Sequence, residues 1–236
     1  MTSPLGVIVT DIARADAGVV DRLAAHGVAT VHEAQGRVGL VGPGIRPVQQ
    51  GTRVGGTAVT VLSWPGDNLM IHAAIEQCLP GDLLVVATSS PSTDGAFGDL
   101  FATALKARGV RGLVTETGVR DIADLREMGF PVWSNGVHSQ GTVKATAGSV
   151  NVPVTVAGQL IRPGDVVIAD DDGVVCVARE RAAEALAGAD ARVSKEEADR
   201  AAYASGAELS LDRKGLRPLL EQLGVRYVAQ SEASDA

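Results

Sequence analysis

Short apolar runs recur between residues 56 and 134, and a segment with helical spacing separates each run from the next. Runs of about four to eight aliphatic and β-branched residues are typical of strands, and a run that is apolar at every position indicates a buried strand. The expected strands cover residues 56–62, 83–87, 112–115 and 131–134, and the expected helices cover 67–79, 98–107 and 121–128. This alternation predicts βαβ units.

The second half of the chain has a different pattern. Three strands are expected at 152–157, 165–169 and 173–177, with turns between them, and a long helix is expected from Arg179 to about Ser205, in two parts around Gly188. Two helices at 16–26 and 30–37 precede the first strand, and Asp16 is the expected N-cap of the first of them. The chain is therefore expected to form a mixed α/β fold. It is not expected to form a dinucleotide-binding domain, since no G-x-G-x-x-G occurs in the right context.

Composition narrows the class of protein. Aromatic residues make up only 3% of the 236 residues, so the core must be built from Val, Leu, Ile and Ala. A net charge of -7 disfavours a nucleic-acid partner. No apolar run approaches the roughly 18 residues of a membrane span, and the opening Met1–Pro4 lacks the positive charge of a signal peptide. Cys78 and Cys176 are expected to be buried free thiols in a reducing cytoplasm.

Two acidic turns carry the strongest chemical signal. Gly98-Asp99-Leu100 is followed about 20 residues later by Gly118-Val119-Arg120-Asp121. Arg offers a planar fork for a carboxylate, and Asp offers a hard oxygen for Mg²⁺, which needs only one or two protein carboxylates. Together they predict a site for an anionic, oxygen-rich substrate and a divalent metal ion. An ordinary Arg–Asp pair in a surface turn is the alternative.

Three further residues each allow two interpretations, and a fourth allows one. Asn68 fits a substrate-binding role or the first turn of a helix, and Lys144 fits an anion-binding role or an ordinary surface position. Glu33 fits a role in a neighbouring subunit's site or a solvated helix face, and His72 is interpreted as structural. Lys144 follows a Gly-Thr-Val stretch and not an apolar strand, so its pKa has less reason to fall and a Schiff base is not predicted.

Three acidic turns are interpreted as structural. Asp82 and Asp165 each belong to a Pro-Gly-Asp turn that leads into a strand. The run Asp170-Asp171-Asp172-Gly173 lacks the spacing of a calcium-binding loop and is expected to be a hairpin turn.

An ordered set of motifs resembles one known family. The motifs, in order, are Thr57–Val61, Pro65–Asn68, Gly98–Leu100, Ala107–Gly112, Gly118–Asp121, Gly129–Trp133, Gly141–Lys144 and Pro163–Gly173. The set is similar to that of the class II pyruvate aldolases that cleave 4-hydroxy-4-methyl-2-oxoglutarate and 4-carboxy-4-hydroxy-2-oxoadipate. The same superfamily includes the regulator of ribonuclease E activity A, which lacks aldolase activity. The resemblance implies a swivelling α/β/β-sandwich fold in a single domain over 1–236, with a core at about 20–217 and a tail at 218–236.

The resemblance also implies an activity and a set of site residues. It implies cleavage of a 4-hydroxy-2-oxo acid to pyruvate and a second 2-oxo acid through a metal-stabilised enolate, with oxaloacetate decarboxylation as a side activity. The cofactor would be Mg²⁺ or Mn²⁺, and the protein would form trimers or hexamers with sites between subunits. The residues it assigns are Asp121 as the direct metal ligand, Asp99 and a neighbour's Glu196 through water, Arg120 and Asp99 as catalytic groups, and Gly98, Leu100, Phe101 and Arg120 as substrate-binding groups. Glu33 as a catalytic group, and Asn68 and Lys144 as substrate-binding groups, complete the predicted site with the alternatives given above.

This sequence departs from the family pattern in two places. The usual Asp-Gly-x-x-Arg-Asp is replaced here by Glu116-Thr117-Gly118-Val119-Arg120-Asp121, which is expected to alter the surroundings of the metal more than its ligand. The segment 135–138 is also unusual. Two alternatives therefore stay open: a non-catalytic regulator that binds a ribonuclease, and a lyase of the same fold that acts on another 2-oxo acid in a biosynthetic pathway.

Overall fold

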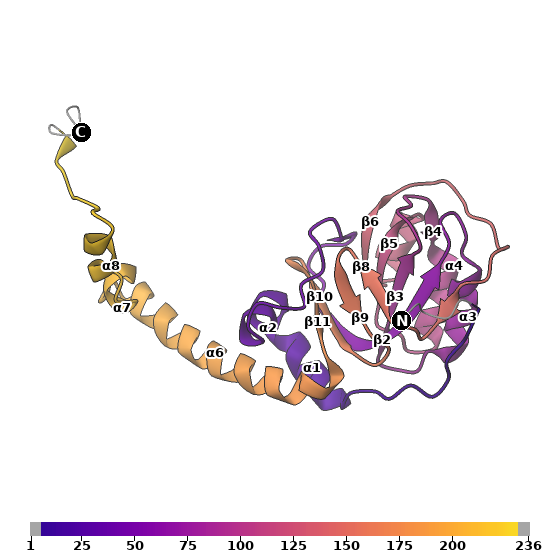
Figure 1. Cartoon of the computed structure of the whole chain (residues 1–236), viewed down its shortest axis with the longest axis horizontal. Helices are drawn as coiled ribbons and strands as arrows, with labels where there is room; N and C mark the ends of the chain where they lie inside the picture. The colour runs from indigo at the N-terminus through magenta and orange to yellow at the C-terminus, as the bar shows by residue number, and fades with distance from the viewer. Residues whose placement is uncertain (1–5, 231–236) are drawn as a thin grey trace. The chain divides into compact units, whose positions relative to one another are not determined.

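The computed structural model describes residues 6–230, and the chain forms two compact units, one ending at Asp190 and the other beginning at Ala191. In the described residues, the first unit is built on a 9-stranded sheet in the order β1-β6-β5-β3-β2-β10-β11, with β4 beside β5 and β7 beside β2 (Figure 1). The strands are β1 Arg46–Pro47, β2 Val54–Ser63, β3 Asp82–Thr88, β4 Gly95–Phe97, β5 Leu113–Val119, β6 Val132–Val137, β7 Ser149–Val150, β10 Val166–Asp170 and β11 Gly173–Val177.

The centre of the sheet is parallel and buried on both faces. Strands β2, β3, β5 and β6 pair in parallel, whereas β10 runs antiparallel to β2 and β11. Along β3, Leu84 and Val86 belong to one hydrophobic cluster, while Leu83 and Val85 belong to the cluster on the other face. A strand buried on both sides needs apolar residues at every position, which explains the uninterrupted run that the sequence shows here.

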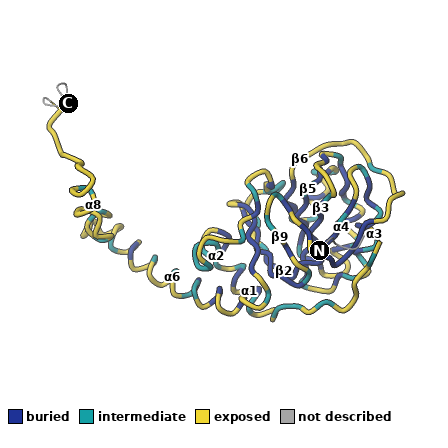
Figure 2. The backbone as a smooth tube through the Cα atoms, viewed as in Figure 1, coloured by how far each residue is buried: buried dark blue, intermediate teal, exposed yellow. Residues whose placement is uncertain are grey.

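Each face of the sheet has its own cover. The helices α3 Leu69–Gln77, α4 Asp99–Ala107 and α5 Ile122–Glu127 contribute to one apolar cluster. The hairpin of β8 Val154–Val156 and β9 Gln159–Ile161 contributes to the second. The helices α1 Ala17–His26 and α2 Val28–Ala34 pack beside β10 and β11 in a third apolar cluster. The buried part of the backbone follows the central strands (Figure 2).

Some local predictions are confirmed. Asp16 caps α1, because its side chain accepts a hydrogen bond from the N–H of Val19 at 3.0 Å. Asp170 pairs with Gly173 across the antiparallel β10–β11 hairpin, as expected for a turn. Asp82 is buried in an ion pair with Arg14 and has a structural role. Both cysteines are free and buried, and burial raises the pKa of the Cys78 thiol to about 12.

The strand expected at 152–157 is present but shorter, as β8 at Val154–Val156. Two further short strands that were not predicted, β7 and β9, lie on either side of it in the sequence. Asn151 adopts a left-handed backbone with φ of 56°, and Pro153 has no N–H to donate to a sheet. These two residues end β7 before β8 begins. The short strands β1 and β4 were also missed, because two or three residues are too few to show a periodicity.

Two helices differ from the predicted ones in their boundaries or continuity. The second helix begins and ends earlier than expected, at Val28–Ala34. The long helix is not divided at Gly188: a 3-10 turn at Arg179–Arg181 leads into one continuous helix, α6, at Ala182–Ala204. A Cβ at Gly188 would lie 3.1 Å from the carbonyl oxygen of Ala34. The glycine therefore serves close packing against α2 and not a helix break.

The second unit consists of the rest of α6 with α7 Ser210–Arg213 and α8 Arg217–Gln222. Asp199 binds both Arg213 and Lys214, which ties α6 to the following helix. The expected frayed tail after Ser231 and the opening Met1–Pro4 lie outside the described residues. None of the helices that the structure describes is long and apolar enough to cross a bilayer.

Candidate functional site

A small pocket of about 100 Å³ forms where the carboxyl ends of neighbouring strands meet one edge of the sheet. Asn68 follows β2, Asp99 follows β4, and Arg120 and Asp121 follow β5. Ligands of α/β sheets bind outside the carboxyl ends of parallel strands. The lining residues are Asn68, His72, Ala96, Gly98, Asp99, Leu100, Phe101, Arg120, Asp121 and Lys144. The structure thus brings together eight of the residues expected from the sequence.

Asp121 is held against the start of α4. It has the left-handed backbone conformation, with φ of 58° and ψ of 44°, which Asp tolerates better than most residues. Its Oδ2 accepts a hydrogen bond of 3.3 Å from the N–H of Asp99. A Cβ at position 98 would lie only 2.1 Å from that oxygen, so Gly98 is required for the two segments to meet. The Asp121 carboxylate therefore lies at the start of α4, and both Asp99 and Asp121 line the pocket.

Arg120 supplies positive charge beside this carboxylate. Its Nε lies 3.5 Å from Asp121 Oδ2, and its side chain is 47% exposed. The guanidinium passes beside Gly141, where a Cβ would lie 3.3 Å from its Nη1. A guanidinium carries five N–H donors in a fixed fork. Most of these donors stay available for an anion that enters the pocket.

The first turn of α4 adds backbone donors. Gly98 is the N-cap and has no side chain that could accept from the helix N–H groups. The N–H groups of the first turn have no intrahelical carbonyl to bind, so those of Leu100 and Phe101 can bind an anion. Phe101 stacks on Phe97 with ring centroids 5.6 Å apart, which fixes the helix end, while Leu100 is 78% exposed.

Asn68 is oriented by the backbone around it. Its Nδ2 donates to the carbonyl of Ala96 at 3.1 Å, and its own N–H donates to the carbonyl of Val143. Its side chain makes no cap hydrogen bond to α3. Its Oδ1 is buried without a hydrogen-bond partner in the described structure. A buried oxygen of this kind is costly unless a donor reaches it, which favours the substrate-binding interpretation of Asn68.

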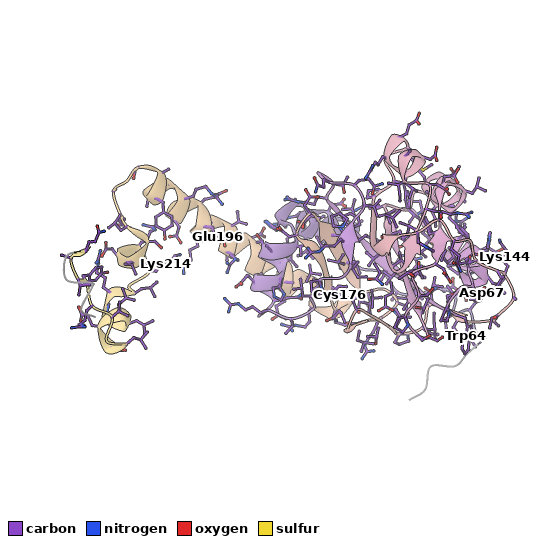
Figure 3. All side chains as sticks on the ribbon, turned by 90° about the horizontal axis from the view of Figure 1, so that it is seen from above. Trp64, Asp67, Lys144, Cys176, Glu196 and Lys214 are labelled. Carbon is purple, nitrogen blue, oxygen red and sulfur yellow. The ribbon has the colours of Figure 1, made fainter. Side chains whose placement is uncertain are left out.

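Asp67 is a residue that the sequence interpretation missed. It is buried, and its Oδ2 accepts hydrogen bonds of 2.8 Å from the N–H groups of both Ala145 and Thr146. It thereby fixes the loop that carries Lys144 to the pocket (Figure 3). Burial by itself raises the pKa of Asp67, but hydrogen bonds from Leu69, Ala145 and Thr146 outweigh burial and lower the pKa below its ordinary value.

Asp67→Asn is expected to loosen the Lys144 loop. Asparagine keeps one carbonyl oxygen but loses the charge, and a hydrogen bond to a charged group contributes about 1.5–3 kcal/mol. The variant should lower the free energy of unfolding by about 2 kcal/mol at neutral pH. Because the pKa is lowered in the folded state, this loss should shrink as pH falls through that folded pKa. Urea unfolding across pH measures it, and a pH-independent difference would contradict it.

His72 is the second residue that sequence reasoning undervalued. Its ring lies against Phe101, with centroids 4.5 Å apart, and it lines the pocket. Loss of water around the ring lowers the pKa of His72, and the nearby charge of Lys144 lowers it further. The structural interpretation therefore accounts for only part of its environment. No local signal could have shown this, because both neighbours come from other segments of the chain.

The His72 titration should have a midpoint below the ordinary value of 6.5. Protonation would place a second positive charge next to Lys144, so the neutral ring is favoured. As pH falls below 6.5, the unfolded chain takes up the proton first, and acidification then lowers the free energy of unfolding. Histidine ring shifts in NMR spectra measure the midpoint. Lys144→Gln should raise it, and an unchanged midpoint in that variant would contradict the assignment.

Two predicted residues lie elsewhere in the chain. Glu33 lies on α2, where Arg37 Nε is 3.1 Å from its carboxylate, and it does not line this pocket. Glu196 lies on the part of α6 that belongs to the second unit, in an ion pair of 2.8 Å with Arg192. A role for either residue in a neighbouring subunit's site stays a prediction. Glu116 does not line the pocket either, since its Oε1 accepts from the N–H of Ala157.

The donor set fits a hydrated divalent cation. No group of three or more His, Cys, Asp or Glu side chains within residues 6–230 is placed to hold a metal ion. Mg²⁺ requires only one or two protein carboxylates and keeps several of its waters. The carboxylates of Asp99 and Asp121, which both line the pocket, provide oxygen atoms of this kind.

Comparison with known proteins identifies the family of the chain. The RraA-like family model, described as Aldolase/RraA, matches residues 15–176. A Halalkalibacterium halodurans protein named "Putative 4-hydroxy-4-methyl-2-oxoglutarate aldolase" is 31% identical over 65% of this chain and 73% of its own length. A Burkholderia multivorans protein of the same name is 35% identical over 60% of this chain and 86% of its own length.

Solved structures show the same fold. The structure of Streptomyces coelicolor RraAS2, described as an unusual member of the RNase ES inhibitor RraA protein family, has a TM-score of 0.73 and 31% identity. The likeness covers 80% of this chain and 99% of that chain. It confirms the mixed α/β fold expected for the superfamily. Together with the family model, it shows that the chain belongs to the RraA-like family.

Proposed function

We propose that this protein is a divalent-metal-dependent aldolase that cleaves a 4-hydroxy-2-oxo acid to pyruvate and a second 2-oxo acid. The observation that carries the proposal is the convergence of Asp99, Arg120 and Asp121 with the α4 N-terminus in one pocket. A protein that only binds a partner has no need for such a pocket. The names of the two relatives support the same reaction class.

The pocket residues suit each part of the substrate. The backbone donors of Leu100 and Phe101 bind the carboxylate next to the keto group, and Arg120 lies where negative charge develops as the carbon–carbon bond breaks. Asp121 would hold Mg²⁺ or Mn²⁺ directly and Asp99 through water, and the ion would supply positive charge to polarise the 2-keto oxygen. Asp99 would orient a water that relays the proton of the C4 hydroxyl to the enolate carbon of pyruvate as the carbon–carbon bond breaks.

The far end of the substrate meets two other side chains. Lys144 offers an ammonium for a second carboxylate, and the buried Oδ1 of Asn68 accepts from a substrate hydroxyl. Lys144 lies in an exposed loop and not in an apolar strand. Its position suits anion binding, and the proposal requires no Schiff base.

A coupled pyruvate-release assay tests the proposal. The substrates are 4-hydroxy-4-methyl-2-oxoglutarate, 4-carboxy-4-hydroxy-2-oxoadipate and oxaloacetate, each with Mg²⁺, with Mn²⁺ and with excess chelator. We expect pyruvate from at least one hydroxy acid, a lower rate from oxaloacetate, and no activity with chelator. Borohydride treatment during turnover should not inactivate the protein. A pyruvyl adduct trapped on a lysine, or no pyruvate from any substrate, would overturn the proposal.

A regulatory function is the second candidate. It rests on the likeness to Streptomyces coelicolor RraAS2, which is described within an RNase ES inhibitor family. Under this alternative, the protein would bind a ribonuclease and lower its rate without releasing pyruvate. The two functions separate in one comparison: variants at Asp121 should lose aldolase activity, whereas inhibition of a ribonuclease would be unchanged by them.

We further propose that the active form is a homotrimer or homohexamer in which Glu196 serves the site of an adjacent subunit. The support is the family resemblance. Mixing inactive Asp121→Ala subunits with inactive Glu196→Ala subunits should restore part of the activity, because some sites then regain both groups. The restored activity is measured after the mixed subunits are unfolded and refolded together. Light scattering confirms the size of the reassembled oligomer. A fully active monomer would contradict the shared site.

A further inference from the structure

A second pocket, of about 430 Å³, lies apart from the site described above and shares no lining residue with it. Its walls come from the loop before β1, the end of β3, the middle of β5, and β6 and β8. Pockets that bind small molecules have volumes of about 300–1,000 Å³. The space is therefore large enough for a compact organic ligand, whereas the first pocket is much smaller.

Glu116 gives this pocket its charge. One carboxylate oxygen, Oε1, accepts a hydrogen bond from the N–H of Ala157, which holds the side chain in place. The other oxygen, Oε2, has no hydrogen bond or ion pair with any of the residues that the structure describes. The lining contains no Lys, Arg or His. A half-buried carboxylate without a cation nearby favours a positively charged ligand over a negative one.

Neutral polar groups surround the carboxylate. The hydroxyl oxygen of Thr88 is buried and has no partner in the described structure. Ser89, Ser90, Thr155 and the amide of Asn135 add further donors and acceptors to the lining. A buried hydroxyl without a partner costs free energy that a hydrogen-bonding ligand would recover. The pocket therefore suits a ligand that carries several hydroxyl groups.

We propose that this pocket binds a hydroxyl-rich organic ammonium ion of about six carbon atoms, with Glu116 binding the ammonium group. The hydroxyl groups would bind Thr88 and its serine neighbours, and the carbon chain would lie along Ile45 and Pro91. This ligand class is opposite in charge to the oxo acids of the first site. The proposal therefore does not depend on the aldolase activity.

Three probes with the same carbon skeleton test the charge preference. Glucamine carries an ammonium group, glucitol carries a hydroxyl in its place, and gluconate carries a carboxylate. We expect saturable backbone amide shifts with glucamine at residues 88–90, 116, 135 and 155–157, with binding at least about tenfold tighter than that of glucitol. Gluconate should cause no shifts in this pocket. Three results would overturn the proposal. They are binding of gluconate as tight as that of glucamine, glucamine shifts confined to the first pocket, and no shifts with glucamine.

Two variants separate the contribution of the Glu116 charge from that of the Thr88 hydroxyl. Glu116→Gln keeps the length of the side chain and an oxygen for Ala157, so it should fold normally but bind glucamine about tenfold more weakly. Glu127→Gln removes the same charge from an exposed position on α5 and is the matched control. Thr88→Val removes the unpaired hydroxyl and should weaken glucamine binding without lowering the Tm. Unchanged affinity in both Glu116→Gln and Thr88→Val would show that glucamine binds elsewhere.

Discussion

Asp121→Asn is expected to lower kcat/KM for pyruvate release by about 10³-fold, because a bound divalent ion contributes several kcal/mol of charge stabilisation. Asparagine is the substitution that best isolates the charge of Asp121. It tolerates the left-handed backbone of Asp121 and keeps an oxygen for the N–H of Asp99, so only the charge is lost. Alanine would add backbone strain to the lost charge.

The measurement pairs turnover with metal affinity. Titration calorimetry with Mn²⁺ should show much weaker binding to Asp121→Asn, with a Tm close to that of the original protein in the presence of chelator. Asp124→Asn is the control, because Asp124 lies exposed in the first turn of α5, three residues further along. Normal turnover in Asp121→Asn would show that this carboxylate does not hold the ion. Equal losses in both variants would show an effect on the helix.

Arg120→Lys is expected to keep the fold but lose about 10²–10³ in kcat, equivalent to roughly 2.7–4 kcal/mol, as for removal of one transition-state donor. Lysine keeps the positive charge but not the planar fork, which can bind a carboxylate and a keto oxygen at once. The side chain is 47% exposed and beside Asp121, so its loss should have little effect on the core. The loss should therefore appear in kcat more than in the Tm.

Chemical rescue distinguishes a catalytic Arg120 from a structural one. Guanidinium ion added at low concentration should restore part of the activity of Arg120→Ala, because the vacated space lies at an accessible pocket wall. Arg162→Lys, at an exposed position in the turn before β10, is the matched control and should be fully active. Turnover near the original rate in Arg120→Lys would identify Arg120 as only a partner of Asp121.

Several parts of the site could be predicted from sequence because their signals are local. The motifs around Asp99 and Asp121 stand between apolar strands and helical segments, so a position at the start of a helix was evident for both. The sequence also shows directly that both residues carry carboxylates. Their convergence with Asn68 could not be derived from local patterns, because it requires β4 to pair with β5. A strand of three residues leaves almost no periodic trace.

The residues that were missed share one property. Asp67 binds Ala145, which lies 78 positions away, and its role depends wholly on that contact. Burial, and then the charge of Lys144 from another segment, lowers the pKa of His72, whose ring also lies against Phe101. Glu116 was expected to influence the metal surroundings, yet it contacts Ala157 and lines a different pocket. Long-range contacts decided each of these outcomes.

The sequence by itself determined the strands buried on both faces, the cap at Asp16 and the turn at 170–173. Each of these depends on the side chains of a few consecutive residues, and their chemistry is fixed before the chain folds. Tertiary structure alone decided that α6 continues through Gly188 and that Asp67 fixes the Lys144 loop. The physical reason is that such contacts join segments distant in sequence, and their geometry exists only once the sheet has assembled.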